Sequence, residues 1–146
     1  MNKEIFKGSP SQLVNVGYFF VCLLVALMGF SHWFFIIVSI YMVGWRILKT
    51  KLHSFYIDQE RVVEKQGVLS SVTNTTELYR GKDVQLLEPL LLRMFNLSTI
   101  VIKTSDKTSP IISIKGVKNG EELQKSIRDQ IEKRRDVKGV VERDFS

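Results

Sequence analysis

The sequence predicts a two-helix transmembrane hairpin followed by a mainly-β domain of about six or seven strands, closed by one C-terminal amphipathic α-helix. No Asp, Glu, Lys or Arg occurs between Lys7 and Arg46 of the 146-residue chain. Beyond Lys51, short segments of alternating apolar and polar residues follow one another, as in a half-buried sheet. Only the segment after Asn119 has a helical period. We therefore divide the chain into membrane anchor, domain and tail, at residues 1–50, 51–137 and 138–146.

The anchor contains two apolar stretches, residues 13–30 and 33–48. Each approaches the roughly 20 residues that a membrane span needs, whereas one helix over both would be about 54 Å long, far more than the hydrocarbon core of about 30 Å. Two spans are therefore expected, with a turn at Gly29–Trp33. A cleaved signal peptide is the rival interpretation. The second apolar stretch and the lack of a small-x-small cleavage site argue against it.

Basic residues flank both predicted spans: Lys3, Lys7, Arg46, Lys49 and Lys51. The connecting turn has no Lys or Arg. The positive-inside rule therefore places both termini in the cytoplasm and His32 at the outer face.

Three small or polar residues interrupt the apolar stretches. Asn15 and Ser39 either line a contact between the helices or are tolerated near a span end, bonded to their own backbone. Cys22 is the only cysteine, so it forms no disulfide within the chain. We expect it to pack as a small apolar residue against lipid or the neighbouring helix. Because no Asp, Glu, Lys or Arg lies in the interior of either stretch, with Arg46 close to the end of the second, an ion path is not indicated.

Period-two patterns and turn residues divide the domain into strands. The expected strands cover residues 52–57, 61–67, 68–72, 74–80, 82–88, 97–105 and 110–116. Ile100 and Ile102 should face the core.

The closing helix follows Asn119. Leu123, Ile127 and Ile131 recur every four residues and form one apolar face. Asn119 is expected to cap the helix in a capping box with Glu122, three positions later. A small curved sheet or partial barrel with an open end would supply the surface that this narrow stripe must cover.

The stretch LLEPLLLRMFN, residues 86–96, is too short and too interrupted to be a third span. Pro89 can start a short helical turn that leads into the next strand. The side chains of residues 90–95 cannot all point in one direction, so at least one or two of the apolar ones should remain exposed. These side chains either fill the core or contact the membrane or a partner. The candidate contact residues are Leu90, Leu91, Leu92, Arg93, Met94 and Phe95.

Four segments together resemble the bacterial pleckstrin-homology (PH) domain family, specifically its membrane-anchored members with a two-span N-terminal unit. In order, they are TTELYRGKDVQLLEPLLLRMFNLSTIVIKTSD, PIISIKGV, NGEELQKSIRDQIEKRR and KGVVERD. The resemblance covers about residues 51–144 and implies a PH-like fold that binds phospholipid headgroups or protein. Gly81 stands where the family usually has a bulky aliphatic residue, which should loosen the packing. Asn96 stands where Gly is commoner, and Asn also tolerates the left-handed conformation.

Several kinds of chemistry are not indicated. Phosphoinositide-binding PH domains use a basic first hairpin, whereas the one here has Asp58 and Glu60 beside a single Arg61. Residues 51–146 carry 17 basic and 14 acidic side chains, a balance too small to predict nucleic-acid binding. His32 and His53 fall in different compartments. The sequence has no spacing typical of metal ligands, no cofactor-binding motif and no recognisable arrangement of catalytic residues. We therefore expect no cofactor and no enzymatic activity.

These features predict a non-enzymatic, membrane-anchored binding or scaffolding module at the cytoplasmic face of a bacterial inner membrane. Its partners would be membrane lipids and either another protein or further copies of itself. The alternatives are a membrane-active subunit of a transport, pore, envelope-stress or defence system, or an anionic-lipid sensor. The candidate contacts for anionic lipid, worth about 1 kcal/mol each near the surface, are Arg46, Lys49, Lys51 and Lys82.

Overall fold

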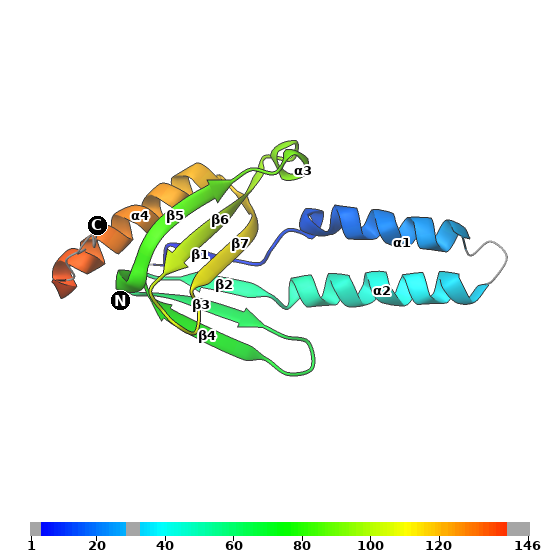
Figure 1. Cartoon of the computed structure of the whole chain (residues 1–146), viewed down its shortest axis with the longest axis horizontal. Helices are drawn as coiled ribbons and strands as arrows, with labels where there is room; N and C mark the ends of the chain where they lie inside the picture. The colour runs from blue at the N-terminus through cyan, green and yellow to red at the C-terminus, as the bar shows by residue number, and fades with distance from the viewer. Residues whose placement is uncertain (1–3, 29–32, 140–146) are drawn as a thin grey trace.

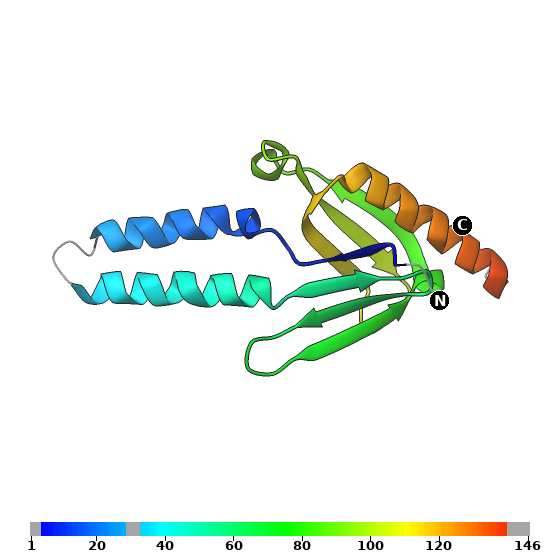
Figure 2. The same cartoon turned by 180° about the vertical axis from the view of Figure 1, so that it is seen from behind.

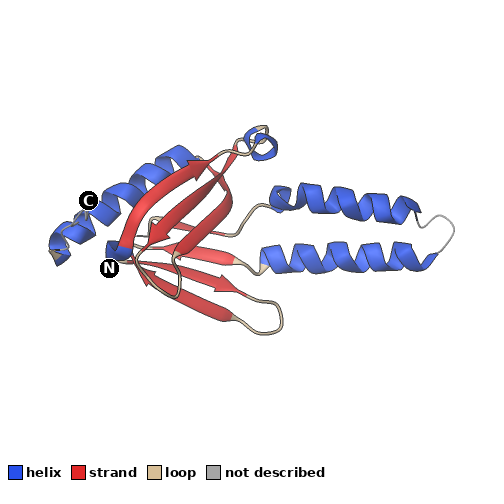
Figure 3. Ribbon diagram, viewed as in Figure 1, coloured by secondary structure: helices blue, strands red, loops and turns tan. Residues whose placement is uncertain are grey.

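The computed structural model describes residues 4–28 and 33–139. Within these residues the chain forms seven strands in two antiparallel sheets, and two long helices extend side by side from one end (Figure 1). A third long helix runs along β5 toward the opposite end, as the reverse view confirms (Figure 2). In Figure 3 the two N-terminal helices extend away from the strands, whereas the C-terminal helix lies alongside them. The prediction of a mainly-β domain with a C-terminal helix is therefore confirmed.

The first sheet has the order β1-β2-β3-β4. Its strands are β1 (Phe6–Gly8), β2 (Ser54–Ile57), β3 (Arg61–Gln66) and β4 (Val72–Glu77). Strand β1 was not expected from the sequence. It precedes the two long helices but pairs with β2, which follows them, and Phe6 lies opposite Ile57. Ile5 and Phe6 also pack against the core, so a segment assigned to the anchor alone forms part of the domain.

The second sheet has the order β5-β6-β7. Its strands are β5 (Gly81–Leu87), β6 (Leu97–Thr104) and β7 (Ile111–Lys118). The pairing of β6 with β7 shifts by one residue at Gly116, because Val117 lies opposite Ser98 whereas Lys115 lies opposite Thr99. Gly116 has a φ of +67°, in the left-handed region that favours glycine. The shift is therefore a β-bulge built around a glycine.

The core lies between the two sheets and helix α4 (Gly120–Lys138). Leu123, Ile127 and Ile131 of α4 are buried, as their spacing predicts. Ile100 and Ile102 of β6 are also fully buried, as predicted. The other buried members of this cluster are Phe55, Ile57, Val62, Leu78, Val84, Ile112, Ile114 and Val117.

The two long helices are α1 (Val16–Met28) and α2 (Trp33–Lys51), and a short 3-10 helix, η1 (Gln12–Asn15), leads into α1. By length and composition, α2 can cross a membrane. Only 6% of its most apolar 18-residue segment is buried. The apolar helix over Gln12–Leu27 is shorter. Among the described residues, one helix therefore passes the length requirement for a span. Most of the predicted turn, including His32, lies outside the described residues.

Two predicted strand segments adopt other structures. Residues 68–71 form the loop between β3 and β4, because Gly67, with a φ of +132°, turns the chain tightly against the Ser70 carbonyl. Leu78–Arg80 form the 3-10 helix η3 instead of extending β4. The chain changes from the first sheet to the second at this point, so β4 cannot continue.

The start of α4 differs from the predicted capping box. Asn119 occupies the N-cap position, but its φ of 52° is left-handed and its side chain makes no capping hydrogen bond. It serves the sharp turn from β7 into α4 instead. Gly81 does not loosen the packing either, because a Cβ there would lie 2.6 Å from Ile131 Cδ1. Asn96, with a φ of 54°, is left-handed as predicted.

Gly116→Ala should destabilise the junction between helices and domain. A Cβ at Gly116 would lie 2.8 Å from Ser11 Cβ and 3.0 Å from Val14 Cγ2, and a left-handed residue with a side chain costs about 1–3 kcal/mol. Gly44→Ala in α2 is the matched control, because nothing lies within 4 Å of a Cβ there. In thermal unfolding of the full-length protein, only Gly116→Ala should lower the melting temperature. Equal melting temperatures for both variants and the wild type would contradict this packing.

Candidate functional site

An exposed apolar surface surrounds helix α3 (Leu90–Arg93). Pro89 precedes the helix as predicted, and Leu92 is buried. The other apolar side chains are exposed: Leu90 by 79%, Leu91 by 55%, Met94 by 77% and Phe95 by 52%. One of the five apolar candidates therefore fills the core, and the four exposed ones form what we call the α3 surface.

The loop between β3 and β4 carries another exposed apolar side chain, Leu69, which is 91% exposed. Figures 1 and 2 show that this loop and α3 both point toward the end of the domain from which α1 and α2 extend. We call this the helix-proximal end. The β2–β3 turn, the β6–β7 turn and the last turns of α4 lie at the opposite, far end (Figure 1). The α3 surface and Leu69 therefore lie at the same end as the apolar helices.

A polar cluster connects η1, which leads into α1, with the end of α2 where the helices meet the domain. Asn15 is 2% exposed. Its amide donates to Thr50 Oγ1 at 2.7 Å, and its carbonyl accepts from Arg46 Nε at 2.9 Å. Gln12 accepts a second bond from Asn15 and donates to the Ile47 carbonyl, each at 3.2 Å. Of the two alternatives for Asn15, the structure supports a contact between the helices.

Cys22 of α1 and Ser39 of α2 are buried, although most side chains of these two helices are exposed. Their positions place small residues at the contact between α1 and α2, where they allow the backbones to approach closely. Ser39 Oγ has no hydrogen-bond partner within the part of the chain that the structure describes.

The four candidate anionic-lipid contacts fall in two places. Arg46, Lys49 and Lys51 lie in the last turns of α2, at the helix-proximal end (Figure 1). Lys82 lies at the start of β5, where it lines a pocket with Arg128 of α4 at the far end. The structure thus brings three of these residues together and separates the fourth from them.

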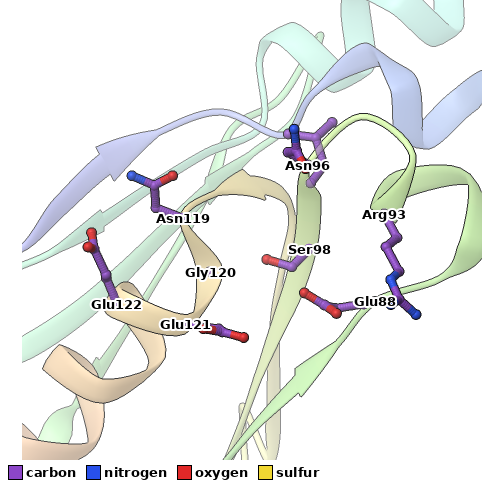
Figure 4. A pocket seen from close by; sticks show the side chains of 9 residues that line it. Glu88, Arg93, Asn96, Ser98, Asn119, Gly120, Glu121 and Glu122 are labelled. Atoms are coloured by element: carbon purple, nitrogen blue, oxygen red, sulfur yellow. The ribbon is translucent and has the colours of Figure 1, made fainter.

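Arg93 belongs to a different environment. It lines a polar pocket of about 560 Å³ between α3 and the start of α4. In Figure 4, Arg93 and Glu88 lie on one side of this pocket and Glu122 on the other, with Glu121 between them. Three carboxylates against one guanidinium leave the pocket with a negative balance. It is therefore unsuited to a phosphate or another anion.

A comparison with known families identifies the fold. The family described as Bacterial PH domain matches residues 12–131, which contain α1, α2 and strands β2 to β7. The chain belongs to the bacterial PH domain family. No curated protein and no solved structure matches it. PH domains are generally non-catalytic binding modules, so the family suggests a binding or scaffolding role. Within residues 4–28 and 33–139, no cluster of His, Cys, Asp or Glu could hold a metal ion.

The β2–β3 turn of the PH domain, at the far end, uses its charged groups to hold the structure. The Asp58 carboxylate accepts the backbone N–H groups of Glu60 and Arg61 at 2.7 and 2.8 Å. Glu60 forms an ion pair with Arg134 of α4. Asp58 thus closes the turn, and Glu60 connects it to the closing helix.

The β6–β7 turn is held in the same way. Asp106 accepts the Thr108 backbone N–H at 2.9 Å, and Arg80 Nη1 lies 3.1 Å from its other oxygen. The hydrogen bond from the Thr108 backbone, and to a smaller extent the attraction of Arg80, lowers the pKa of Asp106 from its usual 3.8. A lowered pKa in the folded state means that the ionised carboxylate stabilises the fold above about pH 4.

Neither the exposed position of Leu69 nor the role of Asn15 was identified from the sequence. Leu69 was assigned to a strand, although a glycine before it and two serines after it indicate a turn. The partners of Asn15 lie more than 30 residues away in α2, so the sequence alone could not choose between its two interpretations.

Asp106→Asn should destabilise the domain more at pH 7 than at pH 3, because the contribution of the ionised carboxylate is lost as the pH falls through its lowered pKa. Urea unfolding of both proteins at the two pH values measures this. An equal loss of stability at both values would show that the carboxylate charge is not what holds the turn.

Leu92→Ala should lower the free energy of unfolding by about 2–4 kcal/mol, because it removes a buried side chain. Leu90→Ala removes the same atoms from an exposed position and should change it by less than about 0.5 kcal/mol. Denaturant unfolding compares the two variants. A similar loss for both would mean that the α3 surface is packed in the folded protein.

Proposed function

We propose that this protein is a membrane-anchored binding module. In this proposal α1 and α2 cross a bacterial inner membrane as a hairpin and hold the PH domain against the cytoplasmic leaflet. The α3 surface and Leu69 contact the membrane interface on either side of the helices. The observation that carries the proposal is that the membrane-length helix α2, the α3 surface and Leu69 all lie at one end of the molecule.

The dimensions of the helices support the anchor. With 19 residues, α2 is about 28 Å long, close to the hydrocarbon core of about 30 Å. Its exposure distinguishes it from the buried core helix of a soluble protein. α1 packs beside it and contains no charged residue. A helix shorter than the membrane is accommodated by local thinning of the bilayer.

The pairing of β1 with β2 supports an uncleaved hairpin. Strand β1 precedes α1, and β2 follows α2, yet Phe6 and Ile57 are directly paired. Cleavage behind either helix would remove β1 and expose part of the core. The same pairing requires the chain to leave and re-enter the sheet on one side of the membrane, as a two-span hairpin does. The basic residues Lys7, Arg46 and Lys49 favour the cytoplasmic side.

A protein partner or a second copy of the chain would bind on the surfaces that face the cytoplasm. With the helix-proximal end against the bilayer, the far end and the edge strand β4 remain accessible. β4 pairs with β3 along one side only, and an unpaired strand edge can accept a strand from a partner. The proposed module therefore contacts lipid with one end and protein with the rest of its surface.

Alkaline extraction and cysteine labelling test this proposal. Sodium carbonate should leave the protein in the membrane pellet. In a Cys22→Ala background, a membrane-impermeant maleimide should label His32→Cys in intact spheroplasts, and Lys107→Cys only after lysis. Release by carbonate would contradict the anchor, and labelling of Lys107→Cys in intact spheroplasts would contradict the cytoplasmic orientation.

A further inference from the structure

An apolar groove lies between the start of α1 and α3, at the helix-proximal end. Its volume is about 350 Å³, and its apolar wall includes Leu13, Leu87, Leu91 and Leu92. Gly17 of α1 also lines it, and nothing lies within 4 Å of a Cβ built there. If α1 enters the membrane as proposed, the groove lies where the headgroup region meets the hydrocarbon core.

A second pocket, of about 140 Å³, also borders η1 and is basic. Arg46, Lys49 and Lys115 line it, and among the described residues no Asp or Glu does. Asn15 accepts a hydrogen bond from Arg46 Nε at 2.9 Å, and the Arg46 guanidinium lies 5.3 Å from the centre of the Tyr18 ring. Both contacts orient the guanidinium. Three cations without a lining carboxylate favour a bound anion.

The groove and the basic pocket are adjacent, since Val14, Ser113 and Lys115 line both. Ser113 and Lys115 alternate with buried residues of β7, so they lie on its outward face. The neighbouring Gly116 lets η1 pack closely on β7, because a Cβ there would collide with Ser11 and Val14. We call the groove and the pocket together the cleft, with the groove as its apolar arm and the pocket as its cationic arm.

We infer that this cleft binds one anionic phospholipid of the cytoplasmic leaflet. Its phosphate lies between Arg46, Lys49 and Lys115, and an acyl chain follows the apolar groove. The inference rests on the proposed function, because a domain held at the bilayer would meet a lipid at this position. A soluble anion would use only the cationic arm, and an apolar peptide only the groove. A phospholipid matches both.

Native mass spectrometry of the full-length protein in detergent tests the cationic arm. Phosphatidylglycerol is titrated as the anionic lipid and phosphatidylcholine as the zwitterionic comparison. The wild type should bind one phosphatidylglycerol more tightly than one phosphatidylcholine. Replacing Lys49 and Lys115 together by Ala should weaken phosphatidylglycerol binding more than tenfold, at roughly fivefold for each charge removed. Phosphatidylcholine binding should change little. Unchanged phosphatidylglycerol binding would overturn the inference.

The matched control replaces Lys103 and Lys107 by Ala. Both are exposed, and they lie at the end of β6 and in the turn after it, at the far end. This variant loses the same charge and should bind both lipids like the wild type. An equal loss of binding in this control would show that net charge, and not the cleft, attracts the lipid.

Gly17→Phe tests the apolar arm without changing the charge. The ring should fill the groove and weaken binding of both lipids, while thermal unfolding checks that the variant folds. If Gly17→Phe binds both lipids like the wild type and glycerol phosphate displaces them, the site is one for a soluble anion and the inference fails.

Carbonate extraction is independent of these titrations. Release of the wild type contradicts the proposed function, whereas retention with unchanged lipid binding by all variants contradicts only this inference.

Discussion

The antiparallel pairing of β1 with β2 is the contact on which the arrangement of this protein depends. The two strands lie on either side of the helical segment in the sequence, and Phe6 faces Ile57 in one sheet. Both ends of the helical pair are thereby attached to the same strand pair, and η1 adds a contact with Gly116 of the second sheet. The helices therefore have a defined direction relative to the domain, and in the proposed function this direction decides which surface of the domain faces the membrane.

Once that direction is set, the two ends of the domain have different chemistry. The helix-proximal end presents the α3 surface, Leu69 and the basic last turns of α2. At the far end, charged groups are paired with one another, as between Arg80 and Asp106, and hold turns together. In the proposed function, the anchor would keep the apolar contacts at a high effective concentration near the bilayer, so that even weak contacts would suffice to orient the domain.

Local patterns of burial could be predicted from the sequence, and non-local pairings could not. The spacing of Leu123, Ile127 and Ile131 identifies the closing helix because one face of one element must be buried. Strand β1 has three residues and no pattern of its own, and its partner follows 46 residues later, after two helices. Asn119 was expected to cap α4 with its side chain, but it adopts the left-handed backbone conformation that the turn into α4 requires, and its side chain makes no capping hydrogen bond. The basic side chain of Lys115 joins Arg46 only through folding.

The depth of single spin labels relative to the bilayer tests the central claim most directly. Labels are placed at Leu69, Met94 and Lys107 of the Cys22→Ala protein in anionic vesicles, and their collisions with oxygen and with a water-soluble nickel complex are compared. Labels at Leu69 and Met94 should favour oxygen, as in the membrane interface, while the label at Lys107 should favour nickel. If all three labels are equally accessible to nickel, the helix-proximal end does not rest on the membrane.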